Sequence, residues 1–109
     1  MIAPVDVADM RSRLGDEALV RDMLRLFADE AGAALDRVLA GRAAGDASAL
    51  KRAAHYLKGM AANISAGELR DACGEVERRA KAGDGEGAGV EELKGLLDRT
   101  LVEVRLLLS

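Results

Sequence analysis

The sequence has few of the side chains on which most catalytic and structural sites depend. Its 109 residues include one histidine, one cysteine, one proline, one tyrosine, one phenylalanine and no tryptophan. A lone histidine and a lone cysteine cannot form a tetrahedral zinc site, and a single cysteine cannot close a disulfide within the chain. Four serines and one histidine do not indicate a Ser-His-Asp triad. We therefore expect no metal site and no cofactor of its own, and covalent chemistry, if present, would lie at His55.

An excess of basic charge and long apolar runs are also missing. The formal net charge is −3, which argues against a nucleic-acid-binding surface. No apolar run is long enough for a signal peptide or a membrane-spanning helix, so no membrane association is expected. The unpaired thiol of Cys73 fits a reducing cytosol, and the excess of arginine over lysine is typical of a GC-rich bacterial genome. We expect a cytoplasmic, bacterial protein.

The sequence is instead rich in alanine and leucine, which favour helices, and glycines separate the helical segments. Amphipathic spacing predicts five helices, over about 6–14, 16–42, 46–64, 66–82 and 90–108, with Asp46 or Ser48 as the cap of the third. Short connections favour an all-α fold, an antiparallel up-down-up-down four-helix bundle capped at one end by the short N-terminal helix. Residues 1–109 are expected to form a single domain. The glycine-rich segment 83–89 lacks the Lys-Ser/Thr ending of a phosphate-binding loop and is interpreted as a flexible connection.

The only histidine lies on the polar side of the third predicted helix. At 100° per residue, His55 is roughly 160° from the centre of the apolar face. Lys51, Lys58, Gly59 and Ala62 share its side of the helix. Their spacing is also compatible with a solvated helix face that carries an incidental histidine.

Two features of this helix face favour a functional interpretation. Glycine within a helix costs about 0.5–1 kcal/mol relative to alanine, so Gly59 suggests that something approaches the backbone closely beside the imidazole. The positive charges of Lys51 and Lys58 favour the neutral, nucleophilic ring and are suited to stabilise the oxygens of a transferred phosphoryl group.

The segment Ala-His-Tyr-Leu-Lys-Gly-Met-Ala-Ala-Asn-Ile at 54–64 resembles the signature of histidine-containing phosphotransfer (HPt) domains. That signature is approximately His-x-Leu-Lys-Gly, followed by small residues and an aliphatic-Gly pair. The resemblance is close over about residues 50–84, and elsewhere it extends only to the number, order and length of the helices. Ser65 departs from the pattern, because the family usually has glycine there, and Gly67 follows two residues later. This departure concerns the shape of the turn, ten residues from His55.

The resemblance implies that His55 accepts a phosphoryl group from an aspartyl phosphate on a receiver domain and passes it to another receiver, in a multistep His-Asp phosphorelay. Lys58 would stabilise the phosphoryl charge, and Gly59 would give clearance for the partner. Ala62 would face the partner, and Lys51 is a further candidate for assisting.

The implied partners are response-regulator receiver domains and a histidine kinase of the ordinary or hybrid type, with Mg²⁺ supplied by the receiver. The protein would be a monomeric phosphocarrier without a nucleotide site, and therefore not an enzyme. Two alternatives remain open: an interaction-only helical bundle that regulates a kinase or receiver by docking, and the phosphoacceptor module of a larger histidine kinase. A chain from Met1 to Ser109 favours a free-standing protein.

Several other side chains have competing interpretations. Glu75 and Glu77 are predicted to lie on solvated helix faces, and Cys73 is predicted to be a core residue. Leu19 and Leu26 either form an exposed patch near His55 or pack against the first helix, and the second interpretation is slightly favoured.

Overall fold

The computed structural model describes residues 3–109, which form helices without any strand. The all-α prediction is confirmed, and the predicted boundaries agree closely with the observed helices. These are α1 (Val7–Leu14), α2 (Glu17–Ala43), α3 (Ala47–Asn63), α4 (Gly67–Lys81) and α5 (Val90–Leu108).

Aspartates begin the first three helices. The carboxylates of Asp6, Asp16 and Asp46 accept hydrogen bonds from backbone amides two or three residues later, at 3.0, 2.8 and 3.0 Å. Each bond satisfies an amide that has no partner within its helix, and such a cap contributes about 1 kcal/mol. Asp46, rather than Ser48, is therefore the cap of the helix that carries His55.

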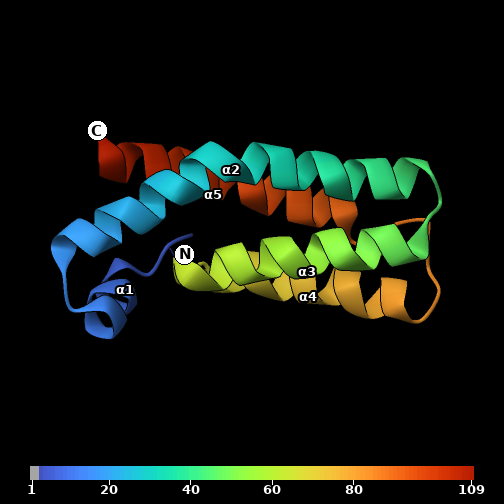
Figure 1. Cartoon of the computed structure of the whole chain (residues 1–109), viewed down its shortest axis with the longest axis horizontal. Coiled ribbons are helices and arrows are strands. Elements are labelled where there is room, and N and C mark those ends of the chain that lie inside the picture. Colours follow the sequence, from blue (N-terminus) through green and yellow to red (C-terminus); the bar gives the residue numbers. More distant parts are fainter. Residues whose placement is uncertain (1–2) are drawn as a thin grey trace.

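The four long helices lie side by side, with α2 next to α5 and α3 next to α4 (Figure 1). The connection from α2 to α3 and the connection from α4 to α5 lie at one end, while α1 lies at the other (Figure 1). Helices α2 and α3 approach closely at Gly41, where a Cβ atom would lie 3.0 Å from the backbone nitrogen of Leu50. Glycine at this position therefore sets the separation of the two helices.

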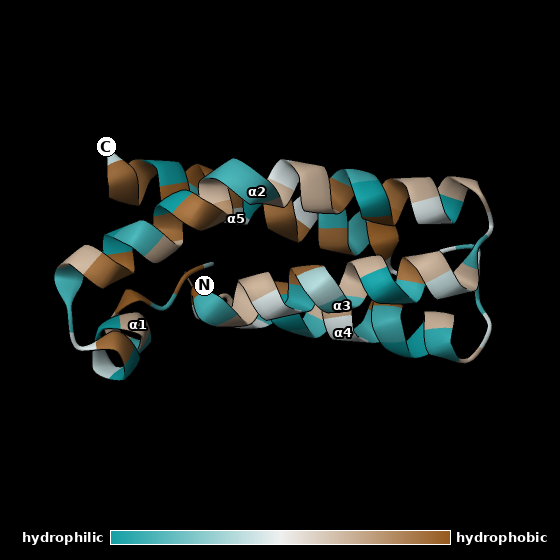
Figure 2. Cartoon of the chain, in the orientation of Figure 1, coloured by the Kyte–Doolittle hydropathy of each residue, from teal (hydrophilic) through white to brown (hydrophobic). Residues whose placement is uncertain are grey.

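The core is aliphatic apart from Phe27 and Cys73, and it runs along the inside of the bundle. Brown segments in Figure 2 mark apolar residues, and teal segments alternate with them along the helices. The largest fully buried side chains include Met10, Leu50, Leu57, Ile64, Leu69, Leu93 and Leu97. Cys73 is also buried, as predicted, and burial raises the pKa of its thiol to about 12. Across residues 3–109, no helix combines the length and apolarity that a membrane crossing requires.

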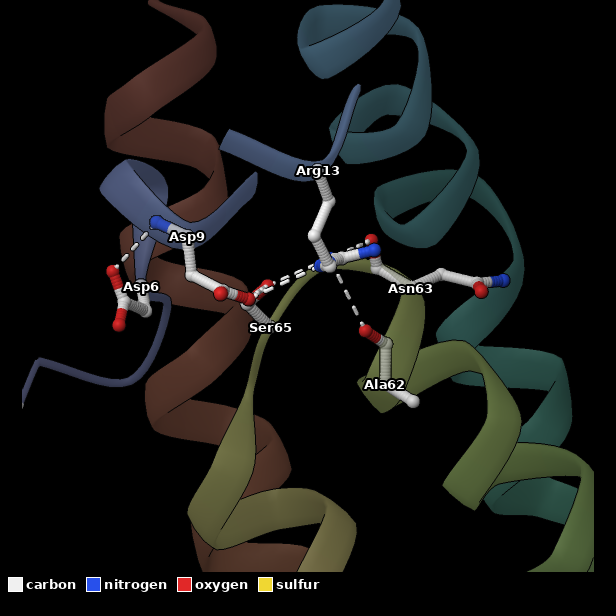
Figure 3. A network of polar contacts seen from close by, with 6 residues as sticks. All are labelled: Asp6, Asp9, Arg13, Ala62, Asn63 and Ser65. Atoms are coloured by element: carbon white, nitrogen blue, oxygen red, sulfur yellow. Dashed lines mark hydrogen bonds and ion pairs between the residues drawn. The ribbon is translucent and has the colours of Figure 1, made fainter. Parts of the chain in front are cut away.

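Helix α1 is attached to the turn between α3 and α4 by a polar network (Figure 3). Ser65 has a backbone φ of +54°, the left-handed region that normally favours glycine. Its hydroxyl donates to Asp9 at 2.6 Å and accepts from Arg13 at 2.7 Å. Arg13 also donates to the carbonyl of Asn63 at 3.2 Å, and the amide of Asp6 donates to the carbonyl of Ser65 at 3.1 Å. The serine thus adopts a backbone conformation typical of glycine, and its hydroxyl bonds to α1.

Candidate functional site

His55 projects from the outer face of α3. Its side chain is 68% exposed, while Ala54 and Leu57 of the same helix are buried in the core. The helical wheel predicted this direction. The apolar residues of α3 recur at helical spacing and form one face, and His55 lies on the opposite face.

Helix α4 places a carboxylate against the imidazole. Oε2 of Glu77 lies 2.6 Å from Nδ1 of His55, and Oε1 lies 2.5 Å from Nζ of Lys58. One carboxylate therefore joins the two side chains that the motif singles out. The side chain of Glu77 is only 19% exposed, so the prediction that it lies on a solvated face is wrong.

A signal for this position was present in the sequence. Cys73, Val76, Glu77 and Ala80 have the i, i+3, i+4, i+7 spacing of an inward-facing stripe, and only Glu77 in that stripe is charged. A carboxylate at the edge of a buried stripe needs a partner from a neighbouring helix. Here α3 provides that partner.

The ion pairs favour the charged form of Glu77. Partial burial opposes ionisation of Glu77 and is the largest single effect. Even so, the hydrogen bonds from Lys58 and His55 together hold the pKa of its carboxyl below the ordinary value. An ionised carboxylate only accepts hydrogen bonds, so the hydrogen-bonding pattern assigns the ring proton to Nδ1 of His55. In the neutral ring, Nε2 then carries the lone pair and has no partner within residues 3–109.

The structure places a carboxylate between Lys58 and the ring. Lys58 contacts Glu77, so its positive charge is partly compensated by a carboxylate that also contacts the imidazole. The expectation that the two lysine charges favour the neutral ring did not include this carboxylate, and it stays a prediction. Lys51 lines a groove on the α3–α4 side together with His55, Glu77 and Lys81.

Gly59 and Ala62 both lie on the exposed side of α3. A Cβ atom built on Gly59 would meet nothing within 4 Å, so packing within the chain does not require glycine there. Both residues line a groove between α3 and α4, to which His55 and Lys58 also belong. Four of the five predicted site residues therefore share one groove, and Lys51 lies beyond its end.

Another groove, of about 380 Å³, runs from His55 between α2 and α3. Its apolar lining comes from Met23, Leu26, Phe27, Met60 and Ile64, and we call it the apolar groove. Leu26 is 44% exposed, so the slightly favoured expectation that it packs against α1 is wrong. Leu19 is exposed as well. The other interpretation of the sequence, an exposed apolar patch beside the histidine, is correct for Leu26.

The other acidic side chains do not form a comparable site. Glu75 pairs with Arg78 and Arg79, and hydrogen bonds from both lower the pKa of its carboxyl to about 2. Among residues 3–109, no group of three or more His, Cys, Asp or Glu side chains is placed to hold a metal ion. The cluster of His55, Lys58 and Glu77 is thus the candidate site.

Comparison with known proteins identifies one family. The family model described as "Hpt domain" matches residues 22–102, which include the whole cluster. No curated protein and no solved structure matches the chain. The family match confirms the resemblance that the motif around His55 predicted.

Proposed function

The chain belongs to the Hpt domain family, which acts in histidine phosphotransfer in phosphorelay signalling, and from that premise we propose that His55 is its phosphoacceptor. His55 takes the phosphoryl group from an aspartyl phosphate on one receiver domain and passes it to an aspartate on another. The observation that carries this proposal is the orientation of the ring. Its Nδ1 is bonded to Glu77 at 2.6 Å, and the side chain is 68% exposed.

The transfer proceeds as an in-line displacement at phosphorus. The lone pair of Nε2 forms the N–P bond, the bond from phosphorus to the aspartyl oxygen breaks, and that oxygen keeps the electron pair as a carboxylate. The Nδ1 proton stays in the hydrogen bond to Glu77. The phosphorylated ring is then an imidazolium, whose positive charge the adjacent carboxylate stabilises. Transfer to the second receiver reverses these steps.

Lys58 and Glu77 act on this reaction in different ways. Glu77 positions the ring and fixes the tautomer in which Nε2 is nucleophilic. Lys58 brings positive charge to the same side of α3 and is suited to stabilise the equatorial oxygens of the transferred group. The receiver partner supplies Mg²⁺, which neutralises further charge on those oxygens. In this proposal the protein is a phosphocarrier and has no nucleotide site.

The surroundings of His55 suit a partner that docks over the ring. The open space above Gly59 gives clearance, the small side chain of Ala62 faces the partner in the adjoining groove, and the apolar groove offers contact area on the other side. Lys51 is the remaining candidate for assisting, through its charge at the end of the site.

The finer architecture belongs to the same proposal. We assign residues 1–109 to a single monomeric domain with an antiparallel up-down-up-down bundle capped by α1. In Figure 1 the chain reverses direction at each connection between the long helices, which supports this topology. The cytoplasmic and bacterial setting stays a prediction.

The test is phosphoryl transfer from a receiver domain that has been charged with labelled acetyl phosphate and Mg²⁺. We expect label on the wild-type protein, none on His55→Gln, and slower labelling of Lys58→Ala. Lys94→Ala is the matched control, because Lys94 is an exposed lysine of α5. Label retained by His55→Gln would contradict the proposal.

The same assay separates the two alternatives. An interaction-only bundle would bind the receiver and take no label. A phosphoacceptor module of a larger kinase would take label from an ATP-binding kinase domain and ATP, but not from the receiver.

A further inference from the structure

Four basic side chains gather on one side of His55. Arg37 of α2, Lys51 and Arg52 of α3, and Lys81 of α4 line two adjoining grooves that share Arg52 and Tyr56. We call these four residues the basic band. Along α3 the band extends from His55 toward the N-terminal end of the helix, whereas the apolar groove extends toward the C-terminal end.

The two grooves of the basic band carry more basic than acidic side chains. None of the four residues forms an ion pair in residues 3–109, although many of the other arginines do. Two carboxylates line the same grooves, but Asp46 caps α3 and Glu77 bridges His55 and Lys58, so neither pairs directly with the band. The protein as a whole carries a net charge of −3, so the charge of the band is opposite in sign to the net charge of the protein.

Local packing holds part of the band in place. The guanidinium of Arg37 lies 5.6 Å from the centre of the Tyr56 ring, within the range of a cation–π contact. Arg52 donates to the hydroxyl of Ser48 at 2.8 Å. These contacts leave the positive charges facing solvent, because neither the ring nor the hydroxyl is anionic. Four like charges in one region repel one another, so the fold gains nothing from their grouping.

We infer that the basic band is the docking site for an acidic surface of the receiver domain that exchanges the phosphoryl group with His55. This inference rests on the proposed function. The receiver places apolar side chains in the apolar groove and acidic side chains on the basic band, with its reacting aspartate over His55 between them. Two chemically different halves on either side of the ring allow one orientation of the partner and disfavour the reversed one.

The position of the apolar groove favours a protein over a nucleotide as the occupant. The polyphosphate of a nucleotide would match the basic band alone and would leave the apolar groove uncovered. A protein surface covers both halves at once, and the size of a specific interface requires contact beyond one ring. Charge complementarity at the band would mainly raise the rate of association.

The test combines charge reversal with ionic strength. Arg37→Glu with Lys81→Glu should lower kcat/KM for transfer from a phosphorylated receiver domain by about 10-fold or more at low salt, and by much less at high salt, where charges are screened. The loss should fall mainly on KM. The control, Lys94→Glu with Arg99→Glu on α5, makes the same change in net charge away from both grooves and should leave kcat/KM nearly unchanged. Leu26→Ser should lower kcat/KM equally at both salt concentrations.

Each outcome has a distinct meaning. Transfer that is insensitive to the band variants, or equally sensitive to the α5 control, overturns this inference and leaves the proposed function standing. A salt-dependent loss seen only with an ATP-binding kinase domain as donor identifies a different occupant and also overturns it. No transfer from any receiver to the wild-type protein removes the proposed function, and this inference with it.

Discussion

Replacing Gly59 with leucine should make the helix more stable and the phosphocarrier slower. Gly59 lies in the interior of α3, its side of the helix is exposed, and an added Cβ would meet nothing within 4 Å. Leucine is a better helix former than glycine by about 0.5–0.8 kcal/mol, and no contact in the chain offsets that gain. For a domain of this size, the melting temperature should rise by about 2–6 °C.

The same substitution should obstruct the partner. Gly59 lines both the apolar groove and the groove between α3 and α4, so a leucine there projects where the partner approaches His55. Overpacking of a fitted surface costs about 1–3 kcal/mol, which corresponds to a loss of about 5- to 150-fold in kcat/KM. The assay is transfer from a phosphorylated receiver domain, with thermal unfolding followed in parallel.

Two other glycines within helices provide control positions for this prediction. Gly32 in α2 and Gly95 in α5 also lie within helices, and an added Cβ would meet nothing within 4 Å at either. Leucine at each should raise the melting temperature as at Gly59, but transfer should stay at the wild-type rate. A stable Gly59→Leu protein that transfers normally would refute the clearance argument. So would an equal loss of transfer in the two controls.

Three further changes test the packing and the polar contacts. Gly41→Ala should lower the free energy of unfolding by about 1–3 kcal/mol, because its Cβ would press on the backbone of α3 at 3.0 Å. Gly32→Ala should instead raise the free energy of unfolding, and urea unfolding compares the two variants. Ser65→Ala should lower the free energy of unfolding by about 1–2 kcal/mol in the same measurement, since alanine keeps the strained φ and loses the hydrogen bond to Asp9. An unchanged unfolding midpoint would contradict this role of Ser65. Glu77 has a lowered pKa in the folded protein, so its contribution to stability is present above pH 4.5 and is lost as the pH falls below that value. Wild type should therefore lose more free energy of unfolding than Glu77→Gln between pH 6 and pH 3, and parallel curves would exclude this linkage.

The helices and the direction of the histidine could be predicted because both follow from local rules. Apolar spacing defined the inner face of α3, and a residue on the opposite side of the wheel must face outward. The starts of the first three helices were predicted to within a residue, and the structure shows that Asp6, Asp16 and Asp46 cap them. These features need no knowledge of which helices are neighbours.

The contacts between helices could not be predicted in the same way. The distance from Glu77 to His55 depends on how α4 rotates and slides against α3, which the periodicity of either helix leaves open. The bonds from Arg13 to Ser65 and Asn63 join residues about fifty positions apart. The sequence flagged Ser65 only as a departure from the family pattern, whereas the structure shows a residue in a left-handed conformation that attaches α1.

The role of His55 as phosphoacceptor is tested most directly by locating the atom that carries the phosphoryl group. Protein labelled with ¹⁵N at its single histidine, and phosphorylated by a charged receiver domain, can be examined by NMR for coupling between phosphorus and each ring nitrogen. We expect phosphorus on Nε2 of His55, with Nδ1 protonated against Glu77. Phosphorus on Nδ1, or label on any other residue, would contradict it.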